Sequence, residues 1–142
     1  FESLTCSHCA NFHKDVYPQL KKEYLDTGLA KIEFRHFPLD IAAFNASKVS
    51  QCKNDGDSKI LNSLFANQQK WVKGSSAEEA NKNLQKFLES QGFSIDFEKC
   101  IENPVLREQL GKDAHDWVME NRTWDVVVKS TLEVYKNLNS RT

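Results

Sequence analysis

Apolar residues follow a helical period in the first part of the chain. They recur at every fourth position, at Phe12, Val16, Leu20 and Tyr24. This spacing predicts a helix that runs to about Asp26 and stops at Gly28. Pro18 lies inside this helix and cannot donate a hydrogen bond to the carbonyl of Lys14, so we expect a kink rather than a straight helix.

Other segments follow the two-residue period of strands. Residues 31–37 alternate, with Ile32 and Phe34 on one face and charged side chains on the other. This alternation predicts a strand. Residues 1–4 predict the end of an earlier strand, and residues 124–129, with three consecutive valines, predict a later one that a final helix follows.

Between residues 41 and 117 the pattern is helical almost throughout. One amphipathic face is formed by Ile60, Leu61, Leu64, Phe65, Gln68, Trp71 and Val72. Ser76 and Glu79 form a capping box for the next helix, which Gly92 ends. Strands joined across helices predict an α/β fold with a mostly parallel central sheet, into which the helical block at about 41–117 is inserted.

Length, composition and charge limit the possible classes of function. A chain of 142 residues suits a single domain, which we expect to span residues 1–142. No apolar run approaches the length of a membrane span, so membrane insertion is not expected. The formal net charge is −1 and the charges are mixed along the chain, which argues against nucleic-acid binding. No export signal is visible at the N-terminus.

The strongest chemical signal is the sequence Cys6-Ser7-His8-Cys9, in which two residues separate two thiols at the predicted start of a helix. Unpaired backbone N–H groups and the positive end of the helix dipole would point at the Cys6 sulfur and stabilise its thiolate. Since the thiolate is the nucleophile in disulfide exchange, the motif predicts a redox site. Cys6 would be the attacking thiolate, and Cys9 the resolving thiol.

Two other interpretations of this motif stay open. The pair could be an inert disulfide, or it could bind zinc together with His13 and with His36 as a fourth ligand. His13 follows Cys9 by four positions on the same helix, which would direct its side chain away from Cys6. We therefore favour redox exchange and expect no metal or organic cofactor.

The segment from Phe1 to Lys14 resembles the active-site segment of DsbA-like thiol–disulfide oxidoreductases of the thioredoxin superfamily. The run from Arg35 to Asp40 is similar to the strand end that follows in the bacterial members with a helical insertion. Residues 64–68 with Trp71 resemble a segment of that insertion. The resemblance covers residues 1 to about 113 and implies a thioredoxin-like fold. It also implies a bacterial periplasmic location, reduced exported proteins as substrates, and a membrane partner that reoxidises the enzyme.

The chain departs from that family in two respects. No proline after about residue 113 matches the cis-proline loop that faces the disulfide in the family, and only five residues precede Cys6. These departures suggest truncation or divergence, with an incomplete sheet. The alternatives are a disulfide reductase or isomerase, or a non-catalytic thioredoxin-like binding module.

The remaining candidate residues have more general roles. His8 could place an imidazole near Cys6, stabilise the thiolate and make the disulfide a stronger oxidant. In an oxidising compartment we expect Cys52 and Cys100 to form a structural disulfide, although two buried free thiols are the alternative. His36 and His115 receive no catalytic role. Core packing is the favoured role of the following aromatic residues, some of which could instead line a surface near the disulfide: Phe1, Phe12, Phe37, Trp71, Trp117 and Trp124.

Overall fold

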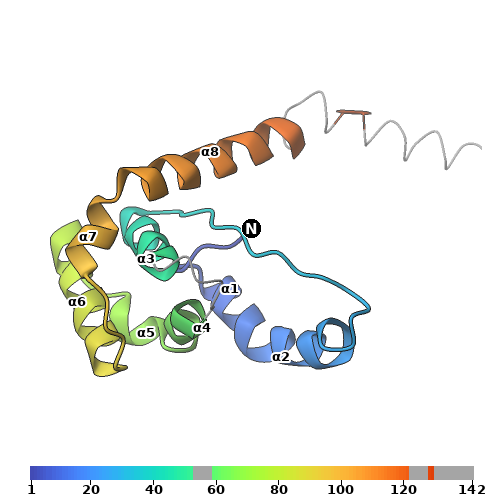
Figure 1. Ribbon diagram of the computed structural model, residues 1–142, viewed down its shortest axis with the longest axis horizontal. Coiled ribbons are helices and arrows are strands. Elements are labelled where there is room, and N and C mark those ends of the chain that lie inside the picture. Colours follow the sequence, from blue (N-terminus) through green and yellow to red (C-terminus); the bar gives the residue numbers. More distant parts are fainter. Residues whose placement is uncertain (53–58, 122–127, 130–142) are drawn as a thin grey trace, which may run out of the picture. The chain divides into compact units, whose positions relative to one another are not determined.

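The computed structural model describes residues 1–52, 59–121 and 128–129 (Figure 1). The chain forms two compact units, Phe1–Arg107 and Glu108–Thr142. The first unit contains both cysteine pairs, so the description of the site concerns this unit alone. No helix in the described ranges is both long enough and apolar enough to cross a bilayer.

The predicted helix after the Cys-x-x-Cys motif is present, but its hydrogen-bond period changes along its length. Its four consecutive segments are α1 (Ser7–Asn11), η1 (Phe12–Val16), α2 (Tyr17–Leu20) and η2 (Lys21–Leu25), where η denotes a π-helix. The π-helical segment η1 ends two residues before Pro18, which cannot supply an N–H to the preceding turn. The last segment ends at Leu25 with Asp26 as its C-cap, close to the predicted end at about Asp26. Gly28 follows in the turn, and its φ of 75° suits a residue without a Cβ atom.

The helices that follow in the described ranges occupy the block that the sequence predicts to be helical. They are α3 (Ile41–Gln51), α4 (Lys59–Ala66), α5 (Gln68–Trp71), α6 (Ala77–Ser90), α7 (Phe97–Glu102) and α8 (Pro104–Asn121). Side-chain caps explain where three of them begin. Asp40, Ser76 and Asp96 each accept a hydrogen bond from the backbone N–H three residues further on. Glu79 completes its cap by accepting from the backbone N–H of Ser75, 2.9 Å away.

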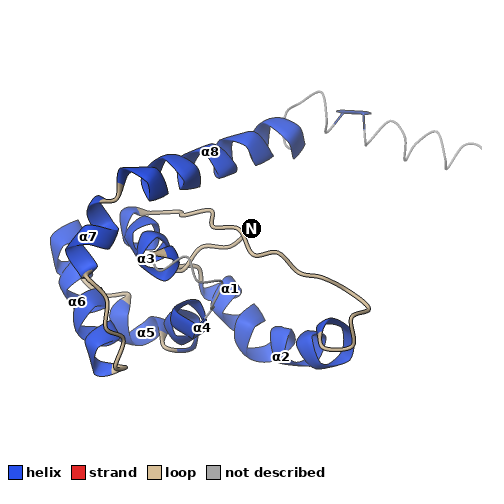
Figure 2. Cartoon of the chain, viewed as in Figure 1, coloured by secondary structure: helices blue, strands red, loops and turns tan. Residues whose placement is uncertain are grey.

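The strand predicted at residues 31–37 is wrong for most of its length, and Figure 2 shows this segment as loop. Its one strand-like contact is an isolated parallel bridge between Glu2 and His36. Backbone hydrogen bonds of 2.9 Å from Glu2 to Arg35 and of 2.8 Å from Phe37 to Glu2 form this bridge. A strand requires a partner along its length, and within the described ranges only this short pairing is present. The predicted parallel sheet therefore stays a prediction.

The last predicted strand and helix lie outside the described residues, except for two positions of the strand. Val128 and Lys129 are helical, which contradicts the strand at these two positions. Three consecutive valines favour a strand only where neighbouring backbone is available to pair, so propensity alone is a weak predictor.

The hydrophobic core of the first unit joins the active-site segment to the helical insertion. Leu4 is fully buried together with apolar residues of α3, α4, α6 and α7. Trp71 is 1% exposed and donates its indole N–H to the carbonyl of Leu64 at 2.9 Å, so its predicted burial is confirmed. The remaining core members are Ala46, Val49, Ile60, Leu61, Phe65, Leu84, Phe87, Leu88, Phe97 and Cys100.

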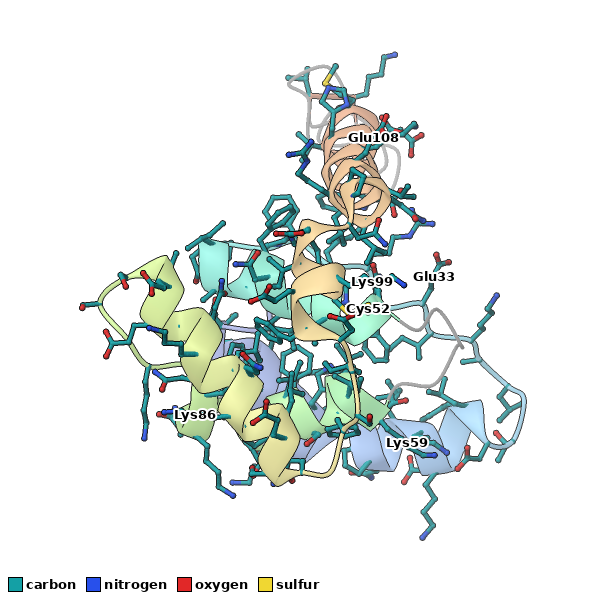
Figure 3. All side chains as sticks on the ribbon, turned by 60° about the vertical axis from the view of Figure 1, so that its left-hand side comes forward. Glu33, Cys52, Lys59, Lys86, Lys99 and Glu108 are labelled. Atoms are coloured by element: carbon teal, nitrogen blue, oxygen red, sulfur yellow. A yellow bond between two sulfur atoms is a disulfide. The ribbon has the colours of Figure 1, made fainter. Side chains whose placement is uncertain are left out.

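A disulfide joins Cys52 to Cys100, with 5.4 Å between their Cα atoms. Cys52 is the residue that ends α3, and Cys100 is buried in α7; Figure 3 shows Cys52 beside that helix. The bridge closes a loop of 48 positions that includes α4, α5 and α6. It therefore links the two ends of the helical insertion.

Candidate active site

Cys6 is the residue that precedes α1, with an extended backbone, and its side chain is partly exposed. Hydrogen bonds from the backbone N–H of Cys9, from the Cys9 thiol and from the backbone N–H of His8 lower the pKa of Cys6, although partial burial opposes them. These donors lie in the first turn of the helix, where N–H groups have no partner within the helix. The site therefore favours a thiolate at Cys6.

Cys9 lies one turn further along and is in the opposite electrostatic situation. Burial raises the pKa of Cys9, and the sulfur of Cys6 and the negative charge of Glu2 raise it further, while a backbone hydrogen bond from Ser3 opposes them. Both cysteines are free thiols in this structure. Two thiols with different acidities suit an exposed nucleophile and a protonated resolving partner.

His8 is exposed between the two cysteines, and its backbone acts on Cys6. Among the described residues, its imidazole makes no hydrogen bond or ion pair with Cys6. The contribution observed at this position is therefore the N–H donor, which any residue except proline would supply.

A buried amide from the helical insertion holds the loop that carries Cys6. The side chain of Gln68, which is 6% exposed, donates hydrogen bonds to the carbonyls of Leu4 at 2.9 Å and Cys6 at 3.0 Å. The carbonyl of Cys6 also accepts from the backbone N–H of Ala10 at 3.1 Å, as expected for the first turn of a helix. Gln68 therefore connects α5 to the segment before the thiol.

A second connection runs from the same loop to the start of α3. The Thr5 hydroxyl donates to the carboxylate of Asp40 at 2.6 Å, and the other oxygen of this carboxylate accepts from the backbone N–H of Ala43 at 2.7 Å. The Ser3 hydroxyl lies 3.3 Å from the Thr5 hydroxyl and accepts from the backbone N–H of Leu39 at 3.3 Å. One carboxylate thus caps a helix and fixes the segment before Cys6.

A buried hydrogen bond between Glu2 and His13 lies close to Cys9. Glu2 and His13 approach to 2.7 Å, and each side chain is 6% exposed. The ring of His13 stacks on Phe65 with centroids 4.1 Å apart, which fixes its orientation. The second oxygen of Glu2 has no hydrogen-bond partner among the described residues. An incompletely satisfied carboxylate is thereby held close enough to influence Cys9.

His36 belongs to the same buried region. Its Nε2 lies 3.1 Å from the hydroxyl of Ser50, and burial lowers the pKa of His36, although the negative charge of Glu2 opposes this effect. No three His, Cys, Asp or Glu side chains come together to hold a metal within the described part of the chain. His13 and His36, the ligands of the alternative zinc site, are instead directed to Glu2 and Ser50.

The expected packing of the aromatic residues near the site is only partly correct. Phe1 and Phe37 are 44% and 36% exposed, and they flank the bridge between Glu2 and His36, which are buried. Successive side chains of extended backbone point to opposite faces, so burial of the two polar residues directs the two phenylalanines outward. Phe12 and Trp117 are partly buried, and Trp124 lies outside the described residues.

Several residues of the site were not identified from the sequence as parts of it. Gln68 entered as part of an amphipathic face and of the resemblance at residues 64–68, and Glu2 and Asp40 were assigned no individual role. Gln68 is 62 positions from Cys6, so no local pattern could connect the two residues. A polar residue on the apolar face of a predicted helix was the available signal, because a buried amide requires partners.

This fold, with a Cys-x-x-Cys dithiol at the start of a helix, is that of a thioredoxin-type protein. The family model described as thioredoxin matches residues 1–124, so the chain belongs to the thioredoxin family. Among solved structures, Wolbachia pipientis alpha-DsbA1 is similar, with a TM-score of 0.70 and 28% sequence identity. The DsbA-like resemblance and the thioredoxin-like fold predicted from the sequence are therefore confirmed.

Curated relatives point to the same group. The chain is 35% identical over 72 residues to a Rickettsia conorii protein and 30% identical over 111 residues to one from Rickettsia typhi, both provisionally named protein-disulfide oxidoreductases. These matches cover 49% and 76% of this chain, but only 26% and 40% of the relatives. The match to alpha-DsbA1 covers 82% of this chain and 59% of that protein. The chain thus spans well under two thirds of the length of each relative.

Proposed function

We propose that the protein is a thiol–disulfide oxidoreductase that introduces disulfides into other proteins through Cys6 and Cys9. The observation that carries this proposal is the opposite effect of the site on two neighbouring thiols. Hydrogen bonds lower the pKa of Cys6, whereas burial raises that of Cys9. An inert disulfide would not require this difference, but a nucleophile with a resolving partner does.

The reaction begins from the oxidised pair. A client thiolate attacks the sulfur of Cys6, so that a mixed disulfide forms and Cys9 leaves as a thiolate that takes up a proton. A second client thiolate then attacks the client sulfur of the mixed disulfide and expels Cys6. The client loses two electrons and gains a disulfide, while the protein is left as a dithiol. Because Cys6 is a stabilised thiolate, it is a good leaving group, which favours oxidation of the client.

His8 is proposed to tune this equilibrium through its exposed imidazole. A protonated ring next to Cys6 would stabilise the reduced protein and raise the reduction potential. Replacement by alanine keeps the backbone N–H and removes only the ring. We expect His8→Ala to lower the potential, and an unchanged potential would assign the whole effect of this position to its backbone.

The wider setting follows from the DsbA-like resemblance and is likewise proposed. The clients would be reduced proteins exported to the bacterial periplasm, and a membrane partner would reoxidise the dithiol. The reaction consumes one disulfide in each cycle, so repeated turnover requires such an electron acceptor. No metal or organic cofactor takes part in these steps.

Oxidation of a reduced client protein by the oxidised chain tests the proposal. We expect Cys6→Ser to reduce the rate to the uncatalysed background, whereas Cys9→Ser should still react with an activated disulfide at Cys6. Full activity of the Cys6 variant would refute the mechanism, and equal inactivity of the wild type would favour a binding module. A potential of about −270 mV, typical of a reducing thioredoxin, would instead favour a reductase.

A further inference from the structure

A groove opens directly beside the proposed redox pair. It has a volume of about 740 Å³ and lies between the helical run that begins at Ser7 and the helices α4 and α5. Ser7 and Ala10, which flank the two cysteines, line one part of it, and Gln68 contributes from α5. Sites that enclose small organic ligands measure roughly 300–1,000 Å³, so this groove could hold several residues of a polypeptide.

The lining of this groove contains basic but no acidic side chains. Its lining contains the three lysines Lys14, Lys21 and Lys70 and no aspartate or glutamate. This contrasts with the whole chain, which has 20 acidic and 19 basic residues. Lys21 pairs with Asp26, but Lys14 and Lys70 are exposed and form no ion pair within the described residues. Two positive charges without local counter-charges favour an anionic partner.

The rest of the lining suits a peptide better than a small anion. Tyr17 and Phe65 contribute apolar surface, as do Ala10 and other small residues. The side chains of Asn62 and Gln69 are exposed and make no hydrogen bond with the rest of the described chain. Side-chain amides can both donate to and accept from the backbone of an extended peptide.

We propose that this groove binds the client polypeptide next to its reactive cysteine and prefers segments that contain aspartate or glutamate. This inference rests on the proposed function, because the client is defined by its exchange with Cys6. Lys14 and Lys70 supply the charge preference, and the neighbouring apolar and amide groups bind the chain without regard to sequence. An exposed ion pair has a small effect, so two of them should change affinity by about three- to tenfold.

Reduced peptides with two cysteines, identical except for glutamate or lysine at the flanking positions, test the preference. We expect the oxidised protein to oxidise the glutamate peptide about three to ten times more efficiently, with a smaller difference at high salt. A flanking charge also changes the reactivity of the peptide itself. The quantity to compare is therefore the glutamate-to-lysine ratio of kcat/KM in different protein variants.

A matched pair of variants separates the groove from the overall charge. In the double variant Lys14→Gln with Lys70→Gln, the glutamate-to-lysine ratio should fall close to a reference ratio. The reference is measured by oxidising the same two peptides with a small-molecule disulfide in the absence of the protein. The control is Lys86→Gln with Lys99→Gln, because these exposed lysines lie on α6 and α7 and do not line the groove (Figure 3). The control removes the same charge and should keep the wild-type ratio. Equal ratios in the two variants would overturn the proposal.

Two further measurements distinguish failure of the groove from failure of the proposed function. Oxidation of dithiothreitol by the wild-type chain reports the exchange chemistry without a peptide, and its absence would refute the proposed function alone. Binding of fluorescent peptides with serine in place of cysteine, followed by anisotropy, reports the groove without any chemistry. Equal binding of the glutamate and lysine forms to the wild type would refute the charge preference.

Discussion

The side-chain amide of Gln68 lies 3.0 Å from the carbonyl oxygen of Cys6, and the same nitrogen lies 2.9 Å from the carbonyl of Leu4. The carbonyl of Cys6 has a second donor in the N–H of Ala10, but that of Leu4 has no other donor among the described residues. Gln68 therefore satisfies a buried backbone acceptor next to the active site. The helical insertion takes part in positioning the proposed nucleophile.

Replacement of Gln68 should destabilise the protein. Gln68→Met keeps the length of the side chain but leaves the carbonyl of Leu4 without a donor, which we expect to lower the free energy of unfolding by about 1–3 kcal/mol. Chemical denaturation measures the change. Gln69→Met is the matched control, because Gln69 is exposed and should tolerate the substitution within about 0.5 kcal/mol. Equal effects of the two substitutions would contradict the role assigned to Gln68.

The acidity of Cys6 should depend more on the backbone of Cys9 than on its thiol. The largest cause of the lowered pKa of Cys6 is the backbone N–H of Cys9, which survives in Cys9→Ala. We expect the pKa of Cys6 to rise in this variant because one donor is lost, yet to stay below the ordinary value of 9.0. The pH dependence of iodoacetamide alkylation measures it, with the urea-unfolded variant as the reference. Identical profiles for the folded and unfolded variant would contradict the prediction.

Burial of His36 should make the protein sensitive to mild acid. Because burial lowers the pKa of His36 from 6.5, the unfolded chain binds the proton more readily than the folded chain. The contribution of His36 to stability is complete above pH 6.5 and is lost as the pH falls through that value towards the folded pKa. The loss can reach about 1.4 kcal/mol per pH unit.

Denaturant unfolding between pH 7 and pH 5 measures this loss. The quantity to compare between the wild type and a His36 variant is the change in the free energy of unfolding per pH unit. His36→Gln should flatten the dependence on pH, although it also lowers the overall stability. His115→Gln is the control, because the side chain of His115 is exposed on α8. A wild-type slope that persists in the His36 variant would assign the acid sensitivity to other groups.

Removal of the structural disulfide should be costly. The bridge between Cys52 and Cys100 closes a loop of 48 positions, for which chain entropy predicts a stabilisation of about 4 kcal/mol. We expect the double variant Cys52→Ala with Cys100→Ala to lose about that much free energy of unfolding, as measured with guanidinium chloride. A loss below about 1 kcal/mol would mean that the unfolded chain gains little freedom when the bridge is absent.

Features with a local cause were predicted well from the sequence. Ser76 and Glu79 mark the start of α6, and Gly92, with φ of 76°, follows its end. The spacing of Cys6 and Cys9 likewise placed both thiols at the start of a helix, because the first turn supplies its hydrogen-bond donors within four residues. In each case the residues that determine the structure are close together in the sequence.

Other features that depend on distant partners were not predicted, although the disulfide between Cys52 and Cys100, 48 positions apart, was. The alternation at Ile32 and Phe34 was interpreted as a strand, but the ring of Phe34 packs on His13 and Tyr17, with centroids 5.0 Å and 5.3 Å away. Packing of one face by aromatic rings thus accounts for the pattern without a neighbouring strand. The groove and its lysines were missed for the same reason, since Lys14 and Lys70 come from segments that only the fold brings together.

The bridge between α3 and α7 also has a consequence for how this molecule matures. Before oxidation the four cysteines of this sequence are thiols. Formation of the disulfide between Cys52 and Cys100 releases two electrons and two protons, and the fold gains its full stability only afterwards. An oxidant must accept these electrons while the new protein folds. A protein with the proposed function would therefore itself be a product of disulfide formation, and its first copies would depend on an oxidant other than themselves.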